Sequence, residues 1–189
     1  MKTKKFLMTA LMVMCAMTTA VFTACSSDDD DKTEEPQNEE PGTGVMECTL
    51  QTSDESLEAF DFFIKYYDSD GQVQSEKVVW NDKLEEGLRV CYKKVVAKLP
   101  ATLGILFEAK AKDGLDPEGQ YYFTRGYNLI FSSFSASGKQ IDYNWNAPFF
   151  QSIRNKKGEF DSIKEPGRIL NIIYQYDSKG KRVGTSSWD

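Results

Sequence analysis

The sequence predicts an all-β domain that folds as an antiparallel β-sandwich. Apolar and polar residues alternate repeatedly, which is the period of a strand with one buried face. Short polar loops that end in glycine separate these runs, and apolar residues at helical spacing are scarce. Many short strands joined by such turns are typical of a sandwich rather than of a parallel sheet covered by helices.

Two kinds of pattern indicate the individual strands. Strict alternation of apolar and polar residues marks strands at residues 46–50, 60–66 and 103–111. Runs rich in β-branched and aromatic residues mark further strands at 73–80, 88–99, 121–134, 140–145 and 168–176, with a last one starting at Val183.

Turn residues connect several of these strands. The loops 68–71, 135–138 and 177–180 each end a short polar stretch with a glycine, which supplies a positive φ, so we expect three hairpins. The resulting eight or nine strands favour an immunoglobulin-like or transthyretin-like sandwich, by architecture alone. A small lipocalin-like barrel is the alternative, because eight strands can also close on themselves.

The long connection at residues 146–167 is the least regular part of the predicted domain. It contains two prolines, two glycines and a basic stretch, and loops of this length are often functional. A short helix at 149–156 that covers one end of the sandwich is an equally open interpretation.

The amino terminus has the layout of a secretory signal. Residues 1–5 contain three lysines, residues 6–21 are almost wholly apolar or small, and Cys25 follows directly after small residues. This arrangement resembles the lipobox of bacterial lipoproteins, which implies cleavage before Cys25 and attachment of palmitate-type acyl chains there. An uncleaved membrane helix is the alternative, because the apolar run reaches the lower limit for a membrane span.

An acidic, polar stretch follows Cys25. Residues 26–44 contain eight acidic residues against one lysine and no large apolar side chain, so they cannot bury enough surface to fold. The beginning, Ser26 and Ser27 followed by four aspartates, resembles the export signal of Bacteroidota-type surface lipoproteins. That resemblance implies an outer-membrane protein, anchored by lipid and facing the cell exterior. We therefore expect a signal peptide at 1–24, a lipidated cysteine with a disordered tether at 25–44, and a single domain at 45–189.

Composition excludes several classes of function. The net charge of −6 lies mostly in the tether, and no basic cluster is larger than residues 154–157, so we expect no nucleic-acid partner. The chain contains no histidine, which rules out serine triads that use histidine and the usual zinc-protease sites. No motif for a cofactor or a metal is present, and we expect no catalytic residues.

Two cysteines remain in the domain once Cys15 and Cys25 are set aside. Cys48 and Cys91 either form a disulfide after export or stay as buried free thiols, and the sequence does not separate these possibilities.

Aromatic residues are the one surplus that suggests a ligand. Trp145, Phe149 and Phe150 cluster where a predicted strand enters the long connection, beside amide and basic side chains. Such a cluster can hold a sugar or a peptide as a flat platform. The alternative is that these rings cap the core, because large aromatic residues are usually buried.

These observations lead to a non-enzymatic cell-envelope lipoprotein whose sandwich binds an extracellular glycan or protein. The alternative is a structural or assembly subunit of a surface fibre or transport complex, in which an edge strand pairs with a partner. A hydrolase that uses two carboxylates is a distant third, because no pair of acidic residues stands out.

Overall fold

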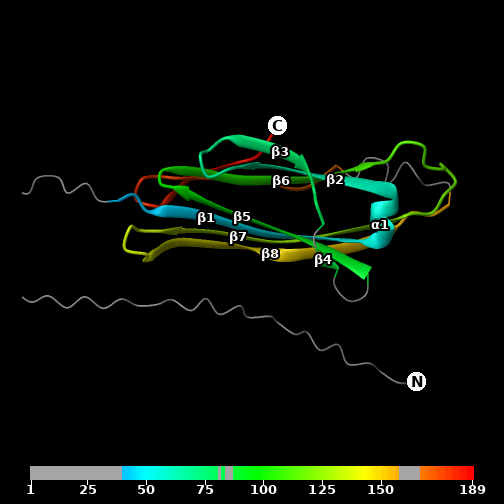
Figure 1. The fold of residues 1–189 in the computed structure, drawn as a ribbon, viewed down its shortest axis with the longest axis horizontal. Coiled ribbons are helices and arrows are strands. Elements are labelled where there is room, and N and C mark those ends of the chain that lie inside the picture. Colours follow the sequence, from blue (N-terminus) through cyan, green and yellow to red (C-terminus); the bar gives the residue numbers. More distant parts are fainter. Residues whose placement is uncertain (1–39, 81, 84–86, 158–166) are drawn as a thin grey trace, which may run out of the picture. The chain divides into compact units, whose positions relative to one another are not determined.

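The domain is a sandwich of two antiparallel sheets, each with five strands (Figure 1). The computed structural model describes residues 40–80, 82–83, 87–157 and 167–189. The predicted all-β sandwich is therefore confirmed, whereas the barrel alternative is wrong because the two sheets do not close on one another. The predicted signal peptide, Cys25 and the tether up to residue 39 lie outside the described residues.

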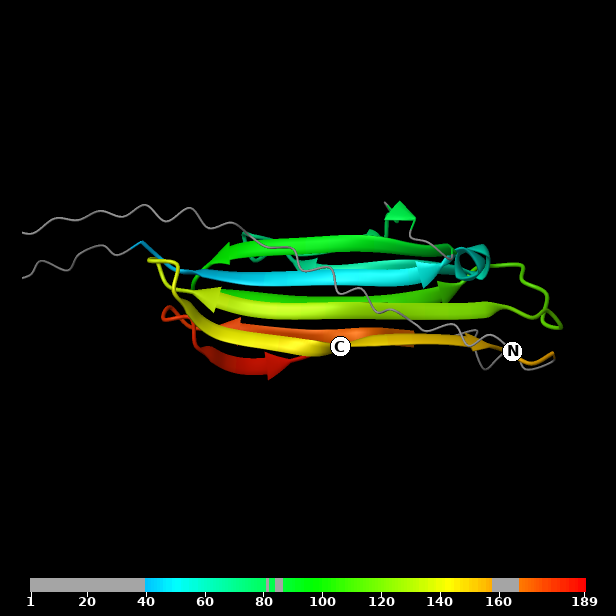
Figure 2. The ribbon, with the colours of Figure 1, turned by 90° about the horizontal axis from the view of Figure 1, so that it is seen from below.

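The first sheet has the strand order β4-β5-β1-β7-β8, and Figure 2 looks onto its outer face. Its strands are β4 (Asp82–Lys83), β5 (Leu88–Lys98), β1 (Thr43–Ser53), β7 (Tyr122–Phe134) and β8 (Gln140–Arg154). The second sheet has the order β10-β9-β6-β2-β3. Its strands are β10 (Arg182–Ser186), β9 (Gly167–Tyr176), β6 (Ala101–Ala111), β2 (Phe60–Tyr67) and β3 (Val73–Lys77).

The core lies between the two sheets and is built by the alternation that the sequence shows. Inward side chains of the central strands are fully buried: Met46, Cys48, Leu50, Phe60, Phe62, Leu103, Ile105, Phe107, Phe123, Leu129 and Phe131. The ring of Phe62 stacks on Phe107 at 5.6 Å between centroids and on Phe123 at 6.1 Å. Because Phe62 and Phe107 belong to the second sheet and Phe123 to the first, the contact between Phe62 and Phe123 joins the two layers.

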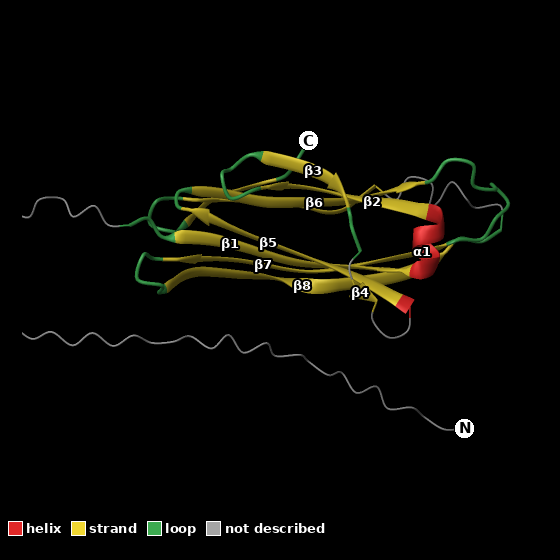
Figure 3. Cartoon of the chain, in the orientation of Figure 1, coloured by secondary structure: helices red, strands yellow, loops and turns green. Residues whose placement is uncertain are grey.

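A short helix, α1 (Asp54–Ala59), lies at one end of the two layers (Figure 3). The side chain of Ser53 caps it by accepting a hydrogen bond from Ser56 N at 3.2 Å. The hydroxyl of Ser56 accepts a second bond from Thr124 N at 2.7 Å, which ties the helix to β7. The sequence does not predict this helix because six residues are too few to show helical periodicity.

The three predicted hairpins are confirmed. In each turn the glycine N–H donates to the carbonyl of the residue three positions earlier, which is Asp68, Ser135 or Asp177. Gly71, Gly138 and Gly180 adopt φ values of 74°, 80° and 76°. The expected last strand is also present, as β10.

The predicted connection at 146–167 begins too early. β8 continues to Arg154 and pairs with β7 along its whole length, so the expected loop at 146–154 and the helix at 149–156 are wrong. Pro148 is accommodated because β8 is an edge strand with a register shift in this part of the ladder. At the other boundary, β1 begins at Thr43, so Thr43 and Gly44 belong to the sandwich and not to the tether.

Candidate functional site

The outer face of the first sheet carries a row of exposed aromatic side chains on β8. Tyr143, Trp145 and Phe150 are 53%, 54% and 53% exposed. They lie opposite Ser132, Ile130 and Gly126 of β7, respectively. We call these three rings the aromatic face. Exposed apolar surface concentrated on one strand is a common mark of an interaction site.

A hydrogen bond holds the indole of Trp145 against the sheet. Its Nε1 donates to Oδ1 of Asn128 on β7 at 2.7 Å. Asn128 is not the residue directly opposite Trp145, so the indole reaches along β7 to make this bond. The bond fixes the ring over β7 and leaves much of its surface exposed.

A glycine makes room for the ring of Phe150. Gly126 lies opposite Phe150, and a Cβ at this position would stand 2.9 Å from Cδ2 of Phe150 and 3.1 Å from Oε1 of Gln51. The ring of Phe150 therefore covers the place of the missing side chain, a pairing that often occurs where a strand contains glycine. Phe150, through Gly126, and Trp145, through Asn128, therefore both lie against β7.

The structure divides the predicted aromatic cluster between two faces. Trp145 and Phe150 belong to the aromatic face, whereas Phe149 lies on the inner side, half-buried, with its ring stacked on Tyr127 at 5.6 Å. The prediction that Phe149 belongs to the platform is wrong. Tyr143 takes its place, and extending the alternation of β8 backwards from Trp145 would have found it.

A β-bulge in β8 determines which face of the sheet Phe149 and Phe150 each occupy. Trp145 and Phe150 are five residues apart, so a regular strand would place them on opposite faces. The register of β7 and β8 shifts between Tyr127 and Leu129, where an extra residue of β8 enters the ladder. The shift brings Phe150 back to the face of Trp145 and turns Phe149 inward.

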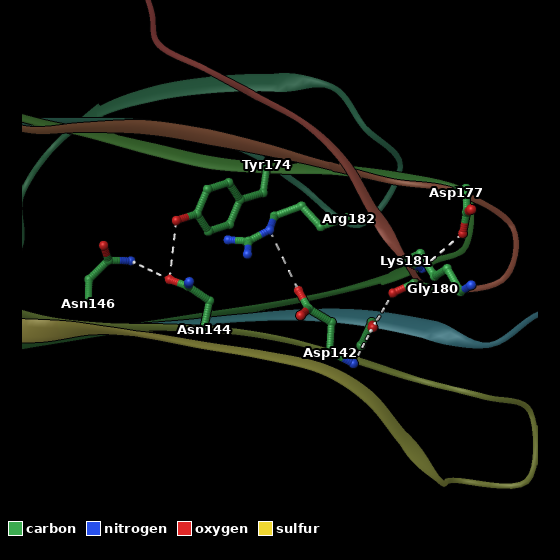
Figure 4. A network of polar contacts seen from close by, with 9 residues as sticks. Asp142, Asn144, Asn146, Tyr174, Asp177, Gly180, Lys181 and Arg182 are labelled. Carbon is green, nitrogen blue, oxygen red and sulfur yellow. Dashed lines mark hydrogen bonds and ion pairs between the residues drawn. The ribbon is translucent and has the colours of Figure 1, made fainter.

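A polar network lies beneath β8, between its inner face and the second sheet (Figure 4). Oδ1 of Asn144 accepts hydrogen bonds from the hydroxyl of Tyr174 at 3.1 Å and from Nδ2 of Asn146 at 3.2 Å. Arg182 stacks over the Tyr174 ring at 4.7 Å, and its Nε lies 3.9 Å from Oδ2 of Asp142. This network links the strand that bears the aromatic face to β9 and β10.

Tyr176 lies next to this network, and its pKa is shifted by its surroundings. Burial, and then the nearby carboxylate of Asp142, raise the pKa of Tyr176. Tyr176 is therefore a neutral phenol at physiological pH. It contributes packing under the edge strand rather than charge.

An ion pair lies on the outer face of the first sheet. Glu47 of β1 accepts from Nζ of Lys94 at 2.7 Å and from the hydroxyl of Tyr92 at 3.1 Å. The hydrogen bond from Lys94 is the largest cause that lowers the pKa of Glu47, partly opposed by burial and assisted by Tyr92. The other polar residues of β1 and β7 on this face, which include Gln51 and Asn128, are uncharged.

The two cysteines lie on neighbouring strands as buried, unbonded thiols. Cys48 stands opposite Lys93 and Cys91 opposite Leu50, so the cysteines are diagonal to one another in the ladder. Diagonal Cβ atoms are about 7 Å apart, whereas a disulfide needs about 3.8 Å. Burial, with a smaller contribution from Cys91, raises the pKa of the Cys48 thiol. The disulfide stays a prediction, and this register does not favour it.

Neither a metal site nor a membrane-spanning helix is found among the described residues. Within the described ranges, no group of three or more acidic or cysteine side chains is placed to hold a metal ion. In the same part of the chain, no helix has the length and apolar character needed to cross a membrane.

The chain matches no protein-family model, no curated protein and no solved structure. The aromatic face is therefore the feature on which a functional argument rests.

Proposed function

We propose that the protein is a non-enzymatic cell-envelope lipoprotein whose sandwich binds an extracellular glycan on the aromatic face. The observation that carries the proposal is the row of three rings, each more than half exposed, on one edge strand. Two of them have fixed positions, Trp145 through Asn128 and Phe150 over Gly126. A ring that is already in place loses little conformational entropy when it binds.

The chemistry of this face suits a sugar. The C–H faces of a pyranose ring are apolar and stack on flat aromatic rings, while its hydroxyl groups need hydrogen-bond partners. The amides of Asn128 and Gln51 lie beside the rings and can supply such partners. Tryptophan and tyrosine are also among the side chains that contribute most to binding energy at many protein interfaces.

The edge of β8 is a poorer site for an added protein strand. A continuous ladder requires regular N–H and C=O groups along the free edge of the strand. Pro148 lacks an N–H, and the bulge interrupts the spacing near the middle of β8. Both features are devices by which natural edge strands avoid pairing. They favour the glycan over the assembly alternative.

Binding of the purified protein to a panel of immobilised glycans tests the proposal. Replacing Trp145 with alanine should weaken binding about tenfold or more, which corresponds to about 1.4 kcal/mol. Tyr92→Ala is the matched control, because Tyr92 is 55% exposed on the same sheet but lies on β5, about 14 Å from β8. Equal loss in both variants, or the absence of glycan binding, would refute the proposal.

The anchor is part of the same proposal and is supported by the sequence of residues 1–44. Intact-mass measurement of the membrane-extracted protein should give a chain that starts at Cys25 and carries acyl groups. Cys25→Ser should abolish the acylation, and protease added to whole cells should remove the domain. A mass without acyl groups would refute the lipid anchor, and full protection from protease would refute the exterior location.

A further inference from the structure

We infer that the ligand of the aromatic face is an extended, uncharged polysaccharide whose chain runs along β8. This inference rests on the proposed function and narrows it to one class of glycan. Three properties of the face lead to it: the length over which the rings are spaced, the pairing of nearby charges, and the direction of the free backbone groups of β8.

The first property is the spacing of the rings. Tyr143 lies opposite Ser132 and Phe150 opposite Gly126, so the outermost rings are six β7 residues apart. At about 3.4 Å per residue this distance is about 20 Å. Trp145 lies between them, two β7 residues from Tyr143. A single sugar ring can cover one of these positions, and an extended chain is needed to contact all three.

The second property is the charge of the surroundings. Recognition of an acidic glycan normally uses Arg or Lys side chains that pair with its carboxylates or sulfates. In the cross-strand row of Trp145, Lys94 is engaged by Glu47 at 2.7 Å. Arg154, four residues beyond Phe150, bonds to Gln120 at 2.8 Å and lies over a tyrosine ring. Among the described residues, those that lie opposite the rings on β7 and β1 therefore include amides and hydroxyls but no cation.

The third property is the free edge of β8. Asn155 N donates to Tyr121 O, which sets the alternation of the ladder. Along β8, residues whose N–H and C=O groups form hydrogen bonds with β7 alternate with residues whose N–H and C=O groups point away from β7. Tyr143, Trp145 and Phe150 belong to the second set, because their partners on β7 are even-numbered and Tyr121 is odd-numbered. Each ring is thus accompanied by a backbone donor and acceptor that suit the hydroxyl groups of a chain lying along the edge.

Isothermal titration of the purified protein tests the inference with two comparisons. The first uses a neutral β-glucan, a neutral mannan and polygalacturonate, each at low and at physiological salt. The second uses the oligosaccharide series of the polymer that binds best, from the disaccharide to the hexasaccharide. We expect binding to a neutral polymer that salt does not change, and an affinity that rises at least tenfold along the series.

Variants connect these results to the rings. Trp145→Ala and Phe150→Ala should each remove most of the gain between the disaccharide and the hexasaccharide, whereas Trp145→Phe should keep part of it. Thermal unfolding of each variant checks that the fold is intact, and Tyr92→Ala should leave the series unchanged.

The outcomes separate the inference from the proposed function. Tighter, salt-sensitive binding of polygalacturonate would overturn the uncharged ligand, yet leave a glycan-binding protein. A disaccharide that binds as tightly as the hexasaccharide would overturn the extended chain in the same way. Failure to bind any glycan in any assay would overturn the proposed function together with the inference.

Discussion

The two outer faces of the sandwich each carry a tryptophan, one of which is buried and the other exposed. On the second sheet, Trp188 follows β10 and folds back over the strands, where it is only 7% exposed and packs with Leu106 and Ile173. Its ring also stacks on Tyr67 at 4.7 Å. On the first sheet, Trp145 is 54% exposed, and no segment within the described ranges covers it in this way.

Trp188 has a structural role as a cover of the second sheet, whereas the ring of Trp145 is accessible to a partner. Trp188 is held at its main chain as well as its ring: its N–H donates to Asn171, and its carbonyl accepts from Asn171 and Arg168. The chain therefore has the means to cover apolar surface on an outer face. Trp145 has one side-chain hydrogen bond that orients its ring without burying it. We take this as a reason to look for an external partner of the first sheet.

The largest expected effect on stability comes from replacing each of these two tryptophans, in separate variants, with alanine. Trp188→Ala should lower the free energy of unfolding by about 3 kcal/mol, because it removes a buried ring and uncovers Leu106 and Ile173. Trp145→Ala should cost less than about 1 kcal/mol, since its ring is mostly in water. Urea unfolding of both variants measures the difference. Similar losses of unfolding free energy in the two variants would mean that Trp188 and Trp145 contribute equally to stability, and would contradict the contrast between the two outer faces.

A second pair of variants compares a glycine from each outer face. A Cβ at Gly104 would lie 2.8 Å from Cγ1 of Ile173 and 2.9 Å from the Ile172 carbonyl, so Gly104→Ala should cost about 3 kcal/mol. At Gly126 the nearest atom belongs to the exposed ring of Phe150, and Gly126→Ala should cost about 1 kcal/mol. Gly126→Ala should also weaken glycan binding, because it lifts that ring. Denaturant unfolding and titration give the two readings, and a reversed order of stabilities would contradict this view of the faces.

The polar network under β8 allows a finer test of how the aromatic face is supported. Tyr174→Phe keeps the ring beneath Arg182 and removes the hydrogen bond to Asn144, at an expected cost of about 1 kcal/mol. If this bond positions β8, affinity for the glycan should fall while the fold is retained. Amide hydrogen exchange should rise along β8 and stay constant in β2. Unchanged exchange and affinity would show that the network does not position the strand.

The smallest expected effect concerns the paired charges of the first outer face. The folded-state pKa of Glu47 lies below its ordinary value of 4.5, so its ion pair with Lys94 stabilises the fold above that pH. The contribution is lost as the pH falls through the folded-state pKa. Both side chains are about a third or more exposed, which limits it to less than about 1 kcal/mol. Glu47→Gln should therefore destabilise slightly at about pH 7, and progressively less as the pH falls through the folded-state pKa of Glu47. A constant difference in the free energy of unfolding would argue against the ion pair.

Local patterns were enough to predict the layers of this fold. Alternation located the central strands, and polar turns ending in glycine located the hairpins, because both depend on the residues' own conformational preferences. Helix α1 was missed because six residues are too few to show helical periodicity, and the bond that ties Ser56 to β7 is a tertiary contact. The continuation of β8 past Pro148 was missed for a related reason, since the pairing with β7 outweighs the local preference.

The candidate site shows the same limit more sharply. The sequence by itself determined that aromatic residues gather near Trp145, and that the domain is a sandwich without histidine chemistry. Only the tertiary structure decided that Phe150 joins Trp145 while Phe149 turns inward, because a bulge changes the phase of side chains only relative to a paired strand. It also decided that, among the described residues, Trp188 is buried while Trp145 is exposed. Burial depends on which distant segments fold over a face, and spacing along one strand does not contain that information.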